Sequence, residues 1–137
     1  MSGKIERLLN QIAGWPLTEK PDGPRTFFIY VEAARAVADA SVYQEYDDRA
    51  VWVEPTHNLF ELLHELWDTA DDNDKWGTLK LAVDGERFTA SFDYDIHLDV
   101  EDDLHDYREN ALLARYGNKP IIYPPPPTDA MELRPAS

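Results

Sequence analysis

The segment from residue 93 to residue 101 carries side chains that can bind a metal ion at every second position. Asp93, Asp95, His97, Asp99 and Glu101 would all project from one side if this segment were extended. Carboxylate oxygens suit Mg²⁺ or Ca²⁺. A helix-loop-helix calcium loop is excluded, because leucines occupy the sixth and twelfth positions counted from Asp93, where that loop needs glycine and glutamate. We therefore favour a solvated acidic segment and assign no metal ligands, with a looser cation site at 93–103 as the alternative.

Other patterns that carry catalysis are missing from the sequence. His64 and Glu65 are not followed by a second histidine, because position 68 is Asp68, so the zinc-protease motif is absent. There is no cysteine, and no serine lies in a Gly-x-Ser-x-Gly frame. The glycines are isolated, so no phosphate-binding loop is present. His97 and His105 flank the acidic segment and could pair with its carboxylates. We predict no catalytic residue, no cofactor and no enzymatic activity.

Negative charge is the dominant feature of the composition. The chain holds 27 Asp and Glu against 13 Lys and Arg, giving a formal net charge of −14 over 137 residues. This exceeds the magnitude of about 2–8 that solubility alone requires of a small domain. Such a surface repels nucleic acid and anionic membranes and attracts basic partners. No apolar run approaches the roughly 18 residues of a membrane span. We expect a cytoplasmic protein that binds neither nucleic acid nor membranes.

Three segments show helical spacing of apolar residues, namely 2–13, 56–70 and 103–115. Gly14 and Pro16 are expected to end the first helix. Thr56 is expected to cap the second, whose apolar face is the clearest in the chain. Gly117 is a suitable stop for the third.

Strand patterns fill the intervals between these helices. Residues 26–31, 42–46 and 50–53 predict a three-stranded meander, with a helix at the alanine-rich residues 32–40 as the alternative. Alternation in 78–83 and 87–94, with Asp84 and Gly85 between them, predicts a hairpin. The element order predicts an α+β fold, with three helices and a mainly antiparallel sheet of about five strands. We expect one domain at 1–120 and a proline-rich tail at 121–137.

The second helix and the hairpin carry a family resemblance. The helix reads Leu-Phe-Glu-Leu-Leu-His-Glu-Leu-Trp over 59–67, and an acidic break separates it from Trp-Gly-Thr-Leu-Lys-Leu over 76–81. Asp84-Gly85-Glu86-Arg87-Phe88, Phe92-Asp93-Tyr94-Asp95 and a following Arg108 complete the pattern. In this half of the chain the sequence resembles the YezG-like (DUF600) immunity proteins of bacterial polymorphic toxin systems, or a neighbouring immunity family. The alanine-rich residues 32–40 and the proline-rich end depart from that pattern.

The resemblance implies an antitoxin that binds and neutralises the toxin domain of a secreted bacterial effector. A basic toxin, such as a nuclease, would suit an acidic surface that mimics a phosphate backbone. The oligomeric state stays open. The expected toxin-binding residues are carboxylates and one tryptophan, namely Asp71, Asp72, Asp74, Trp76, Asp93, Asp95, Asp99, Glu101, Asp102, Asp103 and Asp106. The alternatives are a metal-binding protein or metal-dependent enzyme using 93–103, and an adaptor presenting its polyproline run at 124–127.

Overall fold

A computed structural model of the chain describes residues 3–34, 37–70, 75–94 and 101–124, with the side chains of Ala34, Val37 and 101–106 outside that description. Its helices are α1 (Gly3–Glu19), α2 (His57–Thr69) and α3 (Glu101–Tyr116). Its strands are β1 (Thr26–Ala34), β2 (Val37–Glu45), β3 (Ala50–Val53), β4 (Thr78–Asp84), β5 (Arg87–Asp93) and β6 (Ile121–Ile122). The predicted α+β class with a mostly antiparallel sheet is confirmed, and the described residues form six strands where about five were expected.

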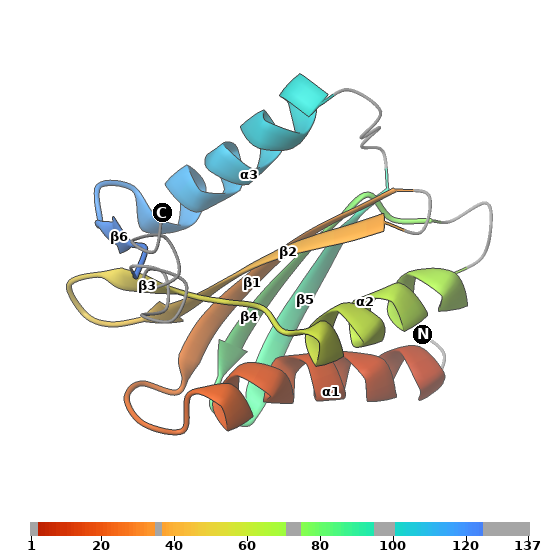
Figure 1. The fold of residues 1–137 in the computed structure, drawn as a ribbon, viewed down its shortest axis with the longest axis horizontal. Coiled ribbons are helices and arrows are strands. Elements are labelled where there is room, and N and C mark those ends of the chain that lie inside the picture. The colour runs from red at the N-terminus through yellow and green to blue at the C-terminus, as the bar shows by residue number, and fades with distance from the viewer. Residues whose placement is uncertain (1–2, 35–36, 71–74, 95–100, 125–137) are drawn as a thin grey trace, which may run out of the picture.

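The strands form one sheet in the order β5-β4-β1-β2-β3-β6 (Figure 1). The predicted meander is confirmed, because β1, β2 and β3 pair antiparallel in succession and the described part of 32–40 is extended. The sixth strand was not expected: β6 pairs parallel with β3, placing Ile121 opposite Ala50. The sheet therefore continues past residue 120, while residues 125–137 lie outside the described part of the chain.

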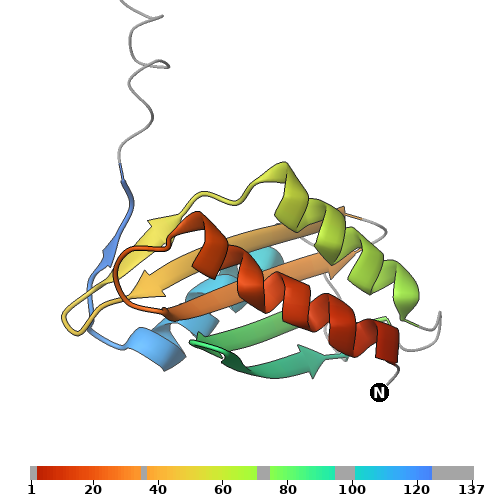
Figure 2. The same ribbon diagram turned by 90° about the horizontal axis from the view of Figure 1, so that it is seen from below.

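Helices cover both faces of this sheet (Figures 1 and 2). Alternate residues of β1 face opposite ways, so Phe27 and Ile29 join the larger core under α1 and α2, while Phe28 and Tyr30 face α3. The larger core is fully apolar at its centre, whereas the α3 core includes buried tyrosines. No helix within the described residues is long and apolar enough to cross a membrane.

The first helix is longer than its sequence predicts. Gly14 and Pro16 were expected to end it, yet α1 continues to Glu19. Proline lacks a backbone N–H and normally interrupts a helix. Here Trp15 and Pro16 are buried, and the Thr18 hydroxyl donates a hydrogen bond to the Gly14 carbonyl at 3.3 Å. Packing against the sheet thus outweighs the local preference for a break, as tertiary contacts often do.

The predicted hairpin is present, but its turn lies one residue later. Asp84 pairs with Arg87, so Gly85 and Glu86 are the two loop residues instead of Asp84 and Gly85. Gly85 has φ of +62°, a conformation that glycine adopts without a steric penalty. This register places Leu79, Leu81 and Val83 on the core face, as the alternation requires.

Candidate functional site

The chain enters β4 and leaves β5 at one end of the sheet. The Gly77 N–H donates a hydrogen bond to the Asp93 carbonyl at 2.8 Å, and the Thr78 hydroxyl donates one to the Asp93 carboxylate at 2.9 Å. The Ala33 N–H in turn donates to the Gly77 carbonyl at 2.9 Å, which ties this point to β1. The acidic stretches 71–74 and 95–103 therefore connect to backbone positions that lie next to each other.

A small apolar crevice opens at the same end of the molecule. It has a volume of about 200 Å³ and is lined by Ile5, Leu66, Ala70, Trp76, Phe92 and Tyr94. The rings of Trp76 and Phe92 are 5.5 Å apart between centroids, and those of Phe92 and Tyr94 are 6.2 Å apart. Trp76 is buried, whereas Tyr94 is 54% exposed. The tryptophan forms the floor of the crevice, and the tyrosine is the aromatic side chain that a partner can reach.

Lys75 holds the end of α2 against this crevice. Its ammonium group donates a hydrogen bond to the Trp67 carbonyl at 2.7 Å and lies 4.4 Å from the centre of the Trp67 ring. The Trp67 indole N–H donates to the Trp76 carbonyl at 3.0 Å. A cation at a helix C-terminus offsets the negative end of the helix dipole. The contacts therefore link the end of α2, through Trp67, to Trp76, which lines the crevice.

The structure describes only part of the predicted binding set. Asp93 lies at the end of β5, partly buried, and accepts the hydrogen bond from Thr78. Trp76 lines the crevice. Outside the described residues are Asp71, Asp72, Asp74, Asp95 and Asp99, together with the side chains of Glu101, Asp102, Asp103 and Asp106. The other lining residues, Ile5, Leu66, Ala70, Phe92 and Tyr94, were not among the predicted contacts. Ile5, Leu66 and Ala70 come together only through the packing of α1 and α2, which no local pattern predicts.

The alternative metal site falls mostly outside the described residues, since Asp93 alone among its four candidate ligands is described. The other three are Asp95, His97 and Asp99. Among the residues that the structure describes, no group of three or more His, Asp or Glu side chains could hold a metal ion. Of the remaining histidines, His57 pairs with Glu61 at 2.9 Å on the exposed side of α2, and His64 is exposed. Neither lines a pocket described above.

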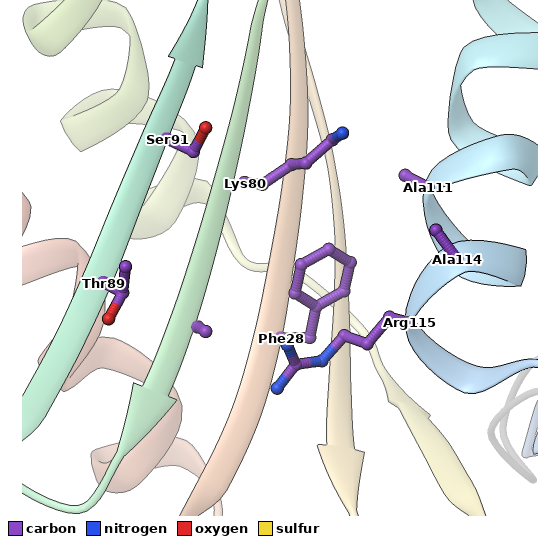
Figure 3. Close-up of a pocket in the computed structure, with 8 residues that line it drawn as sticks. Phe28, Lys80, Thr89, Ser91, Ala111, Ala114 and Arg115 are labelled. Atoms are coloured by element: carbon purple, nitrogen blue, oxygen red, sulfur yellow. The ribbon is translucent and has the colours of Figure 1, made fainter.

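A second hollow lies on the opposite face of the sheet, between α3 and the β4–β5 hairpin. Figure 3 shows Lys80 and Arg115 extending into it over Phe28, with Thr89 and Ser91 on the far wall. Its volume is about 400 Å³, and small residues of α3, Ala111 and Ala114, leave the space open. The outer surface of β5 is uncovered at this groove, since Thr89 and Ser91 are exposed.

Three polar side chains attach α3 to β2 beside that groove. The Arg115 guanidinium donates two hydrogen bonds to the Glu45 carboxylate, that from Nη2 being 2.9 Å long. The Tyr116 hydroxyl donates a third, at 2.7 Å. Burial alone would raise the pKa of the Glu45 carboxyl, but these hydrogen bonds outweigh it and lower that pKa. Burial and the bond to Glu45 raise the pKa of Tyr116. This cluster is structural, because its donors and acceptors satisfy each other.

Carboxylates are spread over the exposed surface of the described chain. They include Glu6, Glu19, Asp22, Asp39, Asp47, Glu54, Glu65, Asp68, Asp84, Glu86 and Glu109. What distinguishes the crevice is therefore not acidity as such. It is the combination of an apolar hollow and an exposed tyrosine, at residues that adjoin two Asp-rich stretches in the sequence.

Comparison with protein-family models and with curated proteins gave no match.

Proposed function

We propose that this protein is an immunity protein, which binds the toxin domain of a bacterial secreted effector and neutralises it. The observation that carries the proposal is the aromatic crevice at the end of the sheet where β4 begins and β5 ends, next in the sequence to the acidic residues 71–74 and 95–103. Gly77 and Asp93 are hydrogen-bonded at this end of the sheet, and the rings of Trp76, Phe92 and Tyr94 stack in succession there. The resemblance of the α2 and hairpin sequence to immunity proteins supports the same function.

The two parts of this surface would contribute differently to binding. A net charge of −14 attracts a basic toxin over long range and raises the association rate, an effect that salt screens. An exposed aromatic side chain beside an apolar hollow contributes short-range affinity when a partner covers it. Carboxylates would thus govern how fast the complex forms, and Tyr94 how long it lasts. A toxin whose cleft binds nucleic acid would present the basic surface that this arrangement requires.

The electrostatic part is tested with a variant that neutralises Asp99, Glu101, Asp102 and Asp103 to their amides. The assay partner is the protein encoded by the adjacent gene, tested as the candidate toxin. We expect slower association and a weaker dependence of the association rate on salt, with the dissociation rate nearly unchanged. The matched control neutralises Glu19, Asp22, Asp47 and Glu86, which are exposed. They lie at the end of α1, before β1, and in the β2–β3 and β4–β5 turns, away from Gly77 and Asp93. Equal effects of both variants would show that charge acts without a defined site.

The crevice is tested with Tyr94→Ala, which removes an exposed ring and leaves Trp76 in the core. We expect faster dissociation from the toxin, by about tenfold if the ring is one of the main contacts. Tyr123→Ala is the control, since Tyr123 is also exposed but lies beside β6. Failure of the toxin to bind the unaltered protein at low salt would overturn the proposed function.

A further inference from the structure

Strand β5 forms an open edge of the sheet (Figure 2). Its register with β4 runs without interruption from Thr78–Asp93 to Asp84–Arg87, so β5 has no bulge. The strand contains no proline, and its interior from Phe88 to Phe92 carries no charge. Proteins usually protect an exposed edge strand with a bulge, a proline or a charged side chain, because free backbone groups otherwise pair with another chain. Strand β5 has none of these within its interior. Within the described residues, no strand lies beyond β5.

The positions whose backbone groups face that edge follow from the neighbouring hydrogen bonds. The Gly85 N–H donates to Arg25, and the Ala33 N–H donates to Gly77, so odd-numbered residues of β4 direct their backbone groups to β1. Even-numbered residues of β4 therefore pair with β5, through Arg87, Thr89, Ser91 and Asp93. The remaining positions, Phe88, Ala90 and Phe92, direct their N–H and C=O groups outward.

The sequence of β5 is complementary to itself when reversed about Ala90. An antiparallel copy centred there places Ala90 opposite Ala90, Phe88 opposite Phe92, and Thr89 opposite Ser91. At both ends Arg87 lies opposite Asp93, so two pairs of opposite charge close the strand pair. The positions with outward backbone groups face one another in this register, as a hydrogen-bonded ladder requires.

We propose that the partner of this edge is a second copy of the chain, joined β5 to β5 about a two-fold axis at Ala90. Centring the pair on Thr89 or Ser91 instead keeps the ladder but takes Arg87 away from Asp93. A shift by one residue in the pairing places outward backbone groups opposite inward ones. The register about Ala90 is thus the one that both completes the backbone hydrogen bonds and places Arg87 opposite Asp93.

The axis stands perpendicular to the sheet, so a continuous sheet results with twice the six strands that the described residues of one copy form. α1 and α2 of both copies lie on one face and α3 of both on the other. One strand pair buries less than the ~1,600 Å² of a standard interface, so the association is expected to be of micromolar order. The large negative charge of each copy opposes the approach, so dimerisation requires enough salt to screen it.

A disulfide test reads out the register, because the natural chain has no cysteine. Thr89 and Ser91 are exposed, and in the proposed pair they face each other at a non-hydrogen-bonded position, where Cβ atoms are close enough for a disulfide. Mixing Thr89→Cys protein with Ser91→Cys protein under mild oxidation should give a covalent dimer. Each variant oxidised alone should not, because identical positions are two residues apart along the pair. Disulfides formed equally well by either variant alone would overturn the register.

The dimer itself is tested by sedimentation of the full chain across a range of concentrations at physiological salt. The mass should rise with concentration from 15.8 kDa toward twice that value. Arg87→Asp should weaken the dimer by about tenfold, because two attractive pairs become repulsive, whereas Arg87→Lys should retain it. Ala90→Pro removes an outward N–H and spares the bonds to β4, so it should keep the circular dichroism spectrum and abolish the dimer. A monomeric mass at every concentration would overturn the proposal.

Discussion

Arg115 and Glu45 join the last helix to the second strand through a two-point ion pair, and the Tyr116 hydroxyl completes the set of donors to Glu45. The side chain of Glu45 is 11% exposed and that of Arg115 is 31% exposed. Burying a carboxylate to this extent costs folding free energy unless hydrogen-bond donors surround it. The contact therefore adds a polar attachment of α3 to the sheet beside the apolar packing of Ala111, Leu112 and Tyr116.

The first prediction concerns Glu45 and acid. Because hydrogen bonds hold the folded pKa of Glu45 below its ordinary 4.5, the stability it contributes is present above that value and is lost as pH falls through the folded pKa. Glu45→Gln should lower the free energy of unfolding by about 2 kcal/mol near neutral pH. The difference from the unaltered protein should shrink below pH 4.5. Urea titrations across this range measure it, and a pH-independent difference would contradict the ion-pair account.

A second prediction concerns alkaline unfolding. Burial raises the pKa values of Tyr30, Tyr43 and Tyr116 well above the ordinary value of 10.0. Their raised pKa values contribute stability that is complete below pH 10 and is lost as pH rises toward the folded values. Tyrosinate absorbance should therefore show a late phase, worth three of the seven tyrosines, that coincides with loss of the circular dichroism signal. Ionisation of all seven before unfolding would contradict it.

Thr56 provides a third test. It occupies the N-cap of α2, yet its side chain makes no cap hydrogen bond and instead accepts one from the Trp15 indole at 3.0 Å. Thr56→Val keeps the shape and leaves that indole N–H unpaired, so it should cost about 1–2 kcal/mol of folding free energy. Thr56→Ser retains the oxygen and should cost less. Thermal unfolding of the two variants gives the comparison, and similar losses would assign the effect to packing.

The fourth prediction concerns the contact of Lys75 with Trp67. Lys75→Met should cost about 1 kcal/mol, because the Trp67 carbonyl loses its charged donor and the Trp67 ring loses its cation. Lys75→Arg keeps a donor and a cation and should be milder. Tryptophan fluorescence should also shift in the methionine variant, since both Trp67 and Trp76 border the contact. An unchanged spectrum and unchanged stability would show that the ammonium group is merely solvated.

Local patterns predicted most elements of this fold. Alternation in β4 and β5 and the apolar stripe of α2 identify their elements because one face of each is buried. Pro16 misled the prediction, since its tolerance depends on burial against the sheet. The two-residue β6 has too little sequence to carry a pattern, and its pairing depends on a distant strand. Of the six residues that line the crevice, Trp76 alone was among the predicted contacts, and Ile5 reaches it only through the packing of α1.

The pairing of β6 bears on how the chain folds. The meander and the hairpin close over short loops, whereas Tyr43 and Tyr123 meet across 80 residues of sequence. Closing so long a loop is slow relative to forming a hairpin. Five of the six strands can assemble before Ile121 leaves the ribosome, and until then β3 is an unpaired edge with Trp52 uncovered by Tyr123. Strand β3 of the nascent chain thus stays an unpaired edge until late in synthesis, when a chaperone would have most to protect.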